Sequence, residues 1–112
     1  MDLISQILIF FSGISFLAYG FSLFTSLRMK EEFLRFKLEN FRPLVGILEI
    51  LGGAGLILGL FSYSILIISS GGLTLLMLLG VWVRLRIKDK VILLLPSLLF
   101  MILNLYIFME SI

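Results

Sequence analysis

Long apolar stretches alternate with short charged segments along this chain of 112 residues. The first stretch, Leu3 to Leu27, has 25 residues and no charged side chain, and a helix needs about 20 apolar residues to cross a bilayer. The second, Pro43 to Val83, has 41 residues and a single charge, Glu49. One straight helix of that length would measure about 60 Å, twice the apolar thickness of a bilayer, so the chain must fold back once.

The pattern therefore predicts four membrane-spanning helices in a single transmembrane domain, residues 1–112. We expect the turn between the second and third helices at "FSYS", Phe61 to Ser64. The fold class is all-α, an integral membrane antiparallel four-helix bundle. The predicted spans are residues 3–27, 43–61, 65–84 and 91–109.

Composition supports a lipid environment and removes several kinds of chemistry. The chain is 61% hydrophobic and 14% charged, against about 45–50% and about 25% in soluble domains. It has no cysteine and no histidine, so we expect no disulfide, no metal site and no intrinsic cofactor. A serine–histidine or cysteine–histidine pair is also impossible. No catalytic residue can be assigned, and the sequence leaves open whether the chain is an enzyme.

All nine lysine and arginine residues lie in two loops, five within residues 28–42 and four within residues 84–90. Positive charge is enriched in cytoplasmic loops of membrane proteins. The distribution predicts a multi-pass cell-membrane protein with both basic loops in the cytoplasm and both termini outside.

The first basic loop, "RMKEEFLRFKLENFR", also carries apolar residues at spacings near the helical period. They are Met29, Phe33, Phe36 and Phe41. This pattern predicts a short amphipathic interfacial helix between spans one and two, from about residue 29 to residue 41, lying on the cytoplasmic lipid surface. The alternative is a solvated connector with a few buried phenylalanines.

Each predicted span has one face that is more polar, or built of smaller residues, than the rest. In the first span this stripe comprises Ser12, Ser15, Tyr19, Ser22 and Ser26. Lipid does not stabilise exposed polar groups, so these faces are expected to meet inside the bundle. Close packing of helices would by itself explain the serines and glycines, but it does not explain an ionisable residue at Glu49.

The position of Glu49 predicts a buried polar or ligand-binding site. Glu49 lies about 9–10 Å into the apolar layer from Pro43, and Tyr19 about 13 Å from the same side. An unpaired carboxylate in hydrocarbon is costly, so a cation should lie within reach; we expect Arg84 first and Arg42 second. The predicted site residues are Glu49, Arg84, Arg42, Tyr19 and, nearer the outer face, Asn104.

Three segments resemble the DoxX-like family of small membrane proteins: "FRPLVGILEILGG" in span two, "GGLTLLMLLG" in span three and "LPSLLFMILNLYI" in span four. The resemblance implies a four-helix bundle in a bacterial-type inner membrane. The family takes its name from a subunit of a quinol oxidase, and some relatives are linked to redox or thiol-stress systems. A redox partner would have to bring its own metal or thiol.

Three functions remain open. The first is an accessory subunit that binds a lipophilic ligand, a quinone or another lipid, with Glu49 as proton donor or acceptor. The second is a non-catalytic assembly or scaffold protein in which Glu49 and an arginine fix helix register. The third is a small multidrug exporter, although such exporters carry their carboxylate in span one and show little loop-charge bias. Expected partners are membrane lipids and a membrane redox or assembly protein, and no nucleic acid.

Overall fold

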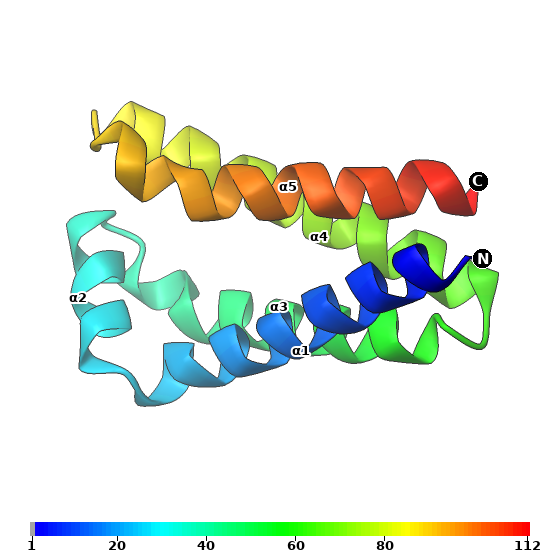
Figure 1. Cartoon of the computed structure of the whole chain (residues 1–112). Coiled ribbons are helices and arrows are strands. Elements are labelled where there is room, and N and C mark those ends of the chain that lie inside the picture. The colour runs from blue at the N-terminus through cyan, green and yellow to red at the C-terminus, as the bar shows by residue number, and fades with distance from the viewer. Residues whose placement is uncertain (1) are drawn as a thin grey trace.

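The structure is a computed structural model that describes residues 2–112, and within them every regular element is helical. Four helices are long and apolar enough to cross a membrane, which confirms the predicted fold class. The elements, shown in Figure 1, are α1 (Leu3–Thr25), α2 (Leu27–Arg35), the 3₁₀ turn η1 (Glu39–Phe41), α3 (Arg42–Leu58), α4 (Tyr63–Arg86) and α5 (Val91–Ser111).

The four long helices form two layers. Helix α1 packs along α3, and α4 packs along α5, while α3 also contacts α4 and α1 contacts α5. The order around the bundle is therefore α1, α3, α4, α5. Figure 1 shows that the layers converge where both termini lie and diverge at the other end, across which α2 lies. The bundle is 40 Å long, close to the about 40–45 Å of a bilayer with its headgroup regions.

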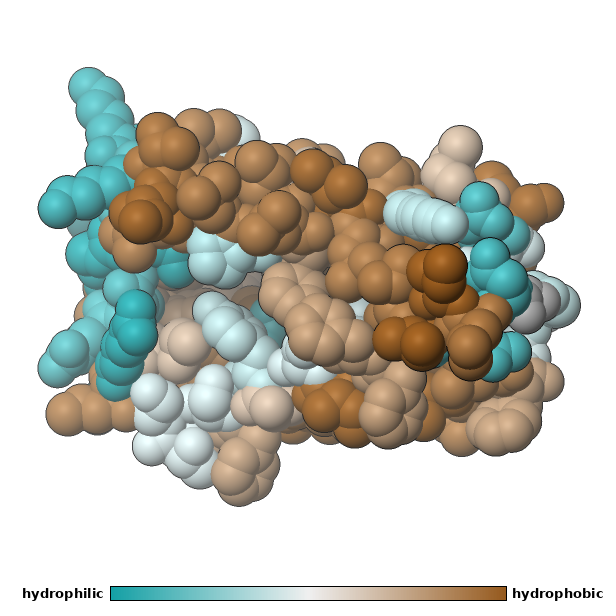
Figure 2. Space-filling view, viewed as in Figure 1, coloured by the Kyte–Doolittle hydropathy of each residue, from teal (hydrophilic) through white to brown (hydrophobic). Residues whose placement is uncertain are grey.

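The surface is apolar along the sides of the bundle and hydrophilic at both ends (Figure 2). Large apolar side chains point outwards from the spans, among them Ile68, which is 76% exposed, and Leu75, which is 62% exposed. Water would not tolerate so much contiguous apolar surface, whereas hydrocarbon solvates it. The buried core is small and lies toward the end of the bundle that carries the two termini. It comprises Ile9, Phe16, Leu56, Leu66, Leu73, Met77 and Ile107.

The turn between α3 and α4 occupies residues 59–62, two residues earlier than the expected Phe61–Ser64. Gly59 explains the difference. A Cβ atom there would lie 2.8 Å from the Cα atom of Leu66, so only glycine lets the end of α3 approach the start of α4 so closely.

The helix after α1 is shorter than the expected range of residues 29–41, because α2 ends at Arg35. Lys37 has a φ of 62°, and the N–H groups of Lys37 and Leu38 bond to the carbonyls of Leu34 and Phe33 at 3.0 and 2.9 Å. This pattern is a Schellman motif, in which one left-handed residue stops a helix. Lys88, with a φ of 58°, ends α4 in the same way.

Candidate functional site

Glycines bring α1 and α3 into backbone contact at two levels. A Cβ atom at Gly53 would lie 2.7 Å from the carbonyl oxygen of Gly13, and one at Gly20 would lie 2.9 Å from that of Gly46. Gly13 and Gly20 are seven residues apart, as are Gly46 and Gly53, so each pair lies on one helix face. Side chains at these four positions would force the helices apart.

Glu49 lies on the same face of α3, three residues after Gly46 and four before Gly53. The glycine contacts therefore turn it toward the bundle interior, and its exposed fraction is only 2%. The burial of Glu49 thus follows from the spacing of the small residues around it.

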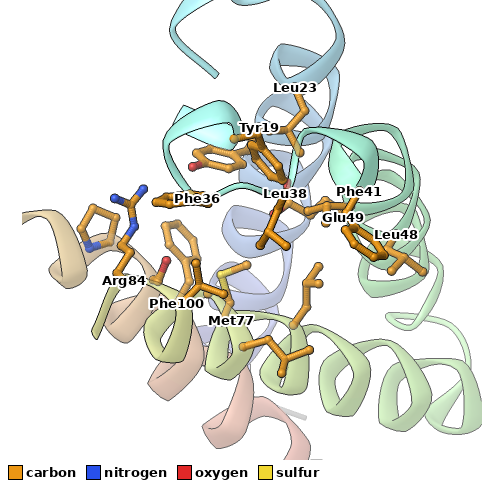
Figure 3. A pocket seen from close by; sticks show the side chains of 18 of the residues that line it. Tyr19, Leu23, Phe36, Leu38, Phe41, Leu48, Glu49, Met77, Arg84 and Phe100 are labelled. Atoms are coloured by element: carbon orange, nitrogen blue, oxygen red, sulfur yellow. The ribbon is translucent and has the colours of Figure 1, made fainter. Parts of the chain in front are cut away.

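A cavity of about 450 Å³ lies between the two layers on the α2 side of the core. Figure 3 shows Glu49, Tyr19, Met77, Phe100 and Arg84 around it. Its walls are mostly apolar and rich in aromatic side chains: Phe16, Phe33, Phe36, Phe41, Trp82 and Phe100. Its polar lining side chains are Ser15, Tyr19, Glu49, Arg84, Arg86 and Ser97. The volume is within the range typical of small-molecule sites, about 300–1,000 Å³.

The expected ion pair of Glu49 does not form within residues 2–112. Its Oε2 atom is buried without a hydrogen-bond partner. Arg84 lines the same cavity but donates to Asp89 at 2.8 Å and to Glu32 at 3.5 Å. Both acids lie at the α2 end beside the guanidinium group, and they engage it in place of Glu49. Arg42, the second expected partner, does not line the cavity.

The α2 end of the cavity is closed by an acid–base cluster of Glu32, Arg35, Arg84 and Asp89. Asp89 accepts from Arg35 at 3.1 and 3.2 Å, and Glu32 accepts from Arg35 at 2.6 Å. The two guanidinium groups lie 5.2 and 5.0 Å from the ring centre of Phe36, at cation–π distance. The cluster therefore ties α2 to the α4–α5 loop.

Acid is expected to loosen this cluster. The hydrogen bonds from Arg35, and secondarily from Arg84, hold the pKa of Asp89 below its ordinary value of 3.8. A lowered folded-state pKa means that the contribution of Asp89 to stability is complete above about pH 4 and is lost as the pH falls through the folded-state pKa. Nitroxide labels at Lys30→Cys and Lys90→Cys should keep a constant separation from pH 7 to pH 5 and move apart below pH 4, as measured by pulsed electron resonance.

The matched control is Asp89→Asn, which removes the charge and retains Glu32 on α2. This variant should show the wider label separation already at pH 7. A separation equal to that of the parent protein at pH 7 would mean that Asp89 does not tie α2 to the loop. Because the chain has no cysteine, both labels can be placed without background.

The predicted site residues separate into two groups. Glu49, Tyr19 and Arg84 line one cavity, but Asn104 lies elsewhere. Asn104 is fully buried, accepts from the hydroxyl of Ser12 at 3.3 Å and donates to the carbonyl of Phe100 at 2.8 Å. It therefore links α5 to α1 and belongs to the packing of the bundle.

Sequence reasoning missed the aromatic walls of the cavity and the cluster that closes it. Phe100 packs edge-to-face on Phe16 with ring centres 5.4 Å apart, and Phe36 is only 8% exposed. Phenylalanine is common throughout this chain, and the spacing of Phe33, Phe36 and Phe41 was interpreted as a lipid-facing pattern, so no signal marked these rings as cavity walls. Asp89 is one of only seven acidic residues, and this scarcity was the one feature of the sequence that could have indicated it as a partner for an arginine.

These features define a class of protein: a polytopic membrane protein whose helices enclose an apolar, aromatic-walled cavity with one buried carboxyl group. The chain belongs to the DoxX-like family, whose family model matches residues 6–106. No curated protein and no solved structure matches the chain. The family match covers all four candidate spans in whole or in large part.

Proposed function

We propose that this DoxX-like protein is an accessory membrane subunit that binds a lipophilic molecule with a planar polar head in the cavity. One observation carries the proposal. The carboxyl group of Glu49 is 2% exposed, has an oxygen without a hydrogen-bond partner, and lines a cavity of about 450 Å³. Buried polar atoms in proteins are nearly always hydrogen-bonded, and a ligand would supply the missing partner.

The chemistry of the cavity favours a ring that carries oxygen atoms, and a quinone is the candidate. Aromatic walls stack on planar rings, and the apolar lining suits a molecule that dissolves in lipid. A protonated carboxyl group donates to a quinone carbonyl, whereas an ionised one accepts from a quinol hydroxyl. Glu49 can therefore hold either form, and a partner protein would carry out any electron transfer.

The competing scaffold hypothesis assigned Glu49 to an ion pair that fixes helix register. That pair is missing within residues 2–112, since Arg84 binds Glu32 and Asp89. The arginine is thus satisfied without Glu49. This arrangement favours a ligand as the partner of the carboxyl group.

Identification of the molecules that remain bound to the purified protein tests the proposal. We expect liquid chromatography with mass spectrometry to detect a quinone or similar ring-containing lipid in detergent extracts of the parent protein. Glu49→Gln should retain the fold and lose the molecule, because the amide cannot ionise and offers a different donor pattern.

The matched control is Glu110→Gln, the same chemical change at an exposed residue outside the cavity. This variant should retain as much of the molecule as the parent protein. Equal retention by Glu49→Gln, or no retained molecule beyond bulk phospholipid in the parent, would overturn the proposal.

We also propose that the α2 end faces the cytoplasm, because the nine basic residues lie in the two loops at that end. A reporter that is active only in the cytoplasm should be silent when fused after Ile112, whereas a reporter active only outside should function. The same pair of reporters placed between Lys88 and Lys90 should give the opposite result. A cytoplasmic signal from the C-terminal fusion would reverse the orientation.

A further inference from the structure

We propose that the ligand reaches Glu49 sideways from the bilayer, through an opening between α1 and α5 that is lined with hydroxyl groups. This inference rests on the proposed function and adds the path and the source of the ligand. The source is the population of amphipathic molecules dissolved in the membrane, and not the aqueous phase.

The opening is bounded on the side of the two termini by contacts between α1 and α5. There α1 and α5 are held together by the bond between Ser12 and Asn104 and by stacking of Phe11 on Phe100, whose ring centres are 6.1 Å apart. Beyond Phe100 the cavity begins, and the two helices separate toward the α2 end (Figure 1). The space-filling view shows a hollow between the two layers on this face (Figure 2).

The α2 end of the cavity is closed by charged side chains. The acid–base cluster joins α2 to the α4–α5 loop, and the side chain of Asp89 is only 6% exposed. Phe36 is buried, and both guanidinium groups lie at cation–π distance from its ring. Two ion pairs cross from α2 to α4 and its loop, Arg35–Asp89 at 3.1 Å and Arg84–Glu32 at 3.5 Å, and water-soluble molecules would have to break them to pass this way.

Hydroxyl groups line the cavity beside this opening. Ser15 and Tyr19 of α1 line it, and Tyr19 is 42% exposed. Ser97 of α5 also lines it; Ser97 lies one heptad before Asn104, on the helix face that contacts α1, and its hydroxyl also lies near Gly80 of α4. Ser15 lies ten residues before the end of α1 at Thr25, or about 15 Å along the helix, which is well inside the apolar layer. The opening therefore faces hydrocarbon.

Among residues 2–112, some hydroxyl groups of the spans bond to their own helix and others do not. Ser22, Ser70 and Thr74 each bond to a carbonyl oxygen of their own helix at 2.6–2.7 Å. The hydroxyls of Ser15 and Ser97 make no such bond among the residues described. Each hydroxyl can hydrogen-bond to the polar head of a ligand that passes from the bilayer to Glu49. Without such bonds, the free-energy cost of desolvating the polar head would oppose its passage. This assigns a role to Ser15 and Tyr19, the two residues of the polar stripe of α1 that line the cavity.

The test measures which reagents reach the cavity, without needing the natural ligand. Met77 is 8% exposed and lines the cavity, so Met77→Cys places the only thiol of the chain inside it. In phosphatidylcholine vesicles, N-phenylmaleimide dissolved in the bilayer should label this thiol. A charged methanethiosulfonate reagent in the water should not.

Narrowing the opening should then slow labelling. In the Met77→Cys background, Ser15→Phe is expected to reduce the labelling rate by N-phenylmaleimide about tenfold, which is an added barrier of 1.36 kcal/mol. Ile14→Phe is the matched control, because Ile14 is the adjacent exposed residue and does not line the cavity. It should label at the parent rate. If Ser15→Phe fails to fold, as judged by circular dichroism, Ser97→Leu on the opposite rim replaces it with the same expectation.

Two further variants separate the competing paths. Leu79→Phe narrows the opposite seam, between α3 and α4, and should not change the rate. Asp89→Asn weakens the closure at the α2 end and should let the charged reagent reach the thiol. Slowing by Leu79→Phe alone, labelling by the charged reagent with Asp89 in place, or no effect of narrowing at Ser15 and Ser97 would each overturn the α1–α5 path. Ligand retention is measured separately, so loss of the proposed function and loss of this path give different results.

Discussion

Gly53→Ala is expected to destabilise the protein by about 3 kcal/mol, at the upper end of the usual cost of inserting a methyl group into a packed interior. The added Cβ atom would lie 2.7 Å from the carbonyl oxygen of Gly13 and 2.9 Å from the backbone nitrogen of Leu17. Both are backbone atoms of α1, so no side-chain rotation can relieve the collision. Separation of α1 from α3 would also move Glu49.

Thermal unfolding in detergent, followed by the fluorescence of Trp82, the single tryptophan, measures the effect. Gly72→Ala is the matched control, since no atom of residues 2–112 lies within 4 Å of a Cβ atom at Gly72. Alanine is favoured over glycine within helices by about 1 kcal/mol, so this variant should be as stable as the parent or slightly more stable. Similar losses at the two positions would show that the close α1–α3 contact is not what makes Gly53 sensitive.

Glu49→Leu, unlike Gly53→Ala, should stabilise the protein, by about 1–3 kcal/mol. Placing a carboxyl group in the apolar layer costs about that much free energy or more. Its Oε2 atom makes no hydrogen bond within residues 2–112, so the substitution removes a desolvated group and breaks no observed contact. The ligand should be lost at the same time. Such opposition between stability and activity is common at functional sites.

Glu32→Leu provides the contrast, because Glu32 accepts from both Arg35 and Arg84. Removing its carboxylate should lower the unfolding temperature of the ligand-free protein, whereas Glu49→Leu should raise it. Destabilisation by Glu49→Leu in protein stripped of ligand would mean that the carboxyl group makes a stabilising contact. The scaffold hypothesis would then gain support.

The four spans could be predicted because charge-free stretches of this length have few alternatives in a protein so apolar. The helix ends were less predictable. Gly59 allowed the turn between α3 and α4 to occur two residues earlier than predicted. Lys37 adopts a left-handed conformation that is usually associated with glycine. Lysine rarely adopts this conformation, so the residue type did not mark the end of the helix.

The candidate site was predicted in part, for a physical reason. Glu49 could be identified because it is an isolated charge between glycines, and from this position its burial could be predicted. Its partner was expected to be Arg84 because both lie at similar depth, but depth alone does not rank competing acids. Asp89 accepts a hydrogen bond from Arg84, which is five residues away along the chain, and another from Arg35, which is 54 residues away. Such competition is decided by the packing of α2 over the bundle, which was not apparent in the sequence.

The pairing of α1 with α3, and of α4 with α5, bears on how the protein is made. The N-terminal half leaves the ribosome first, and it can complete its glycine-lined layer, with Glu49 in place, before α4 and α5 have been synthesised. Phe100, Arg84 and Asp89 arrive only with the second half. The binding cavity is therefore a product of the last step of biogenesis, and a nascent chain arrested after Leu58 would hold the carboxyl group but have no enclosed space beside it.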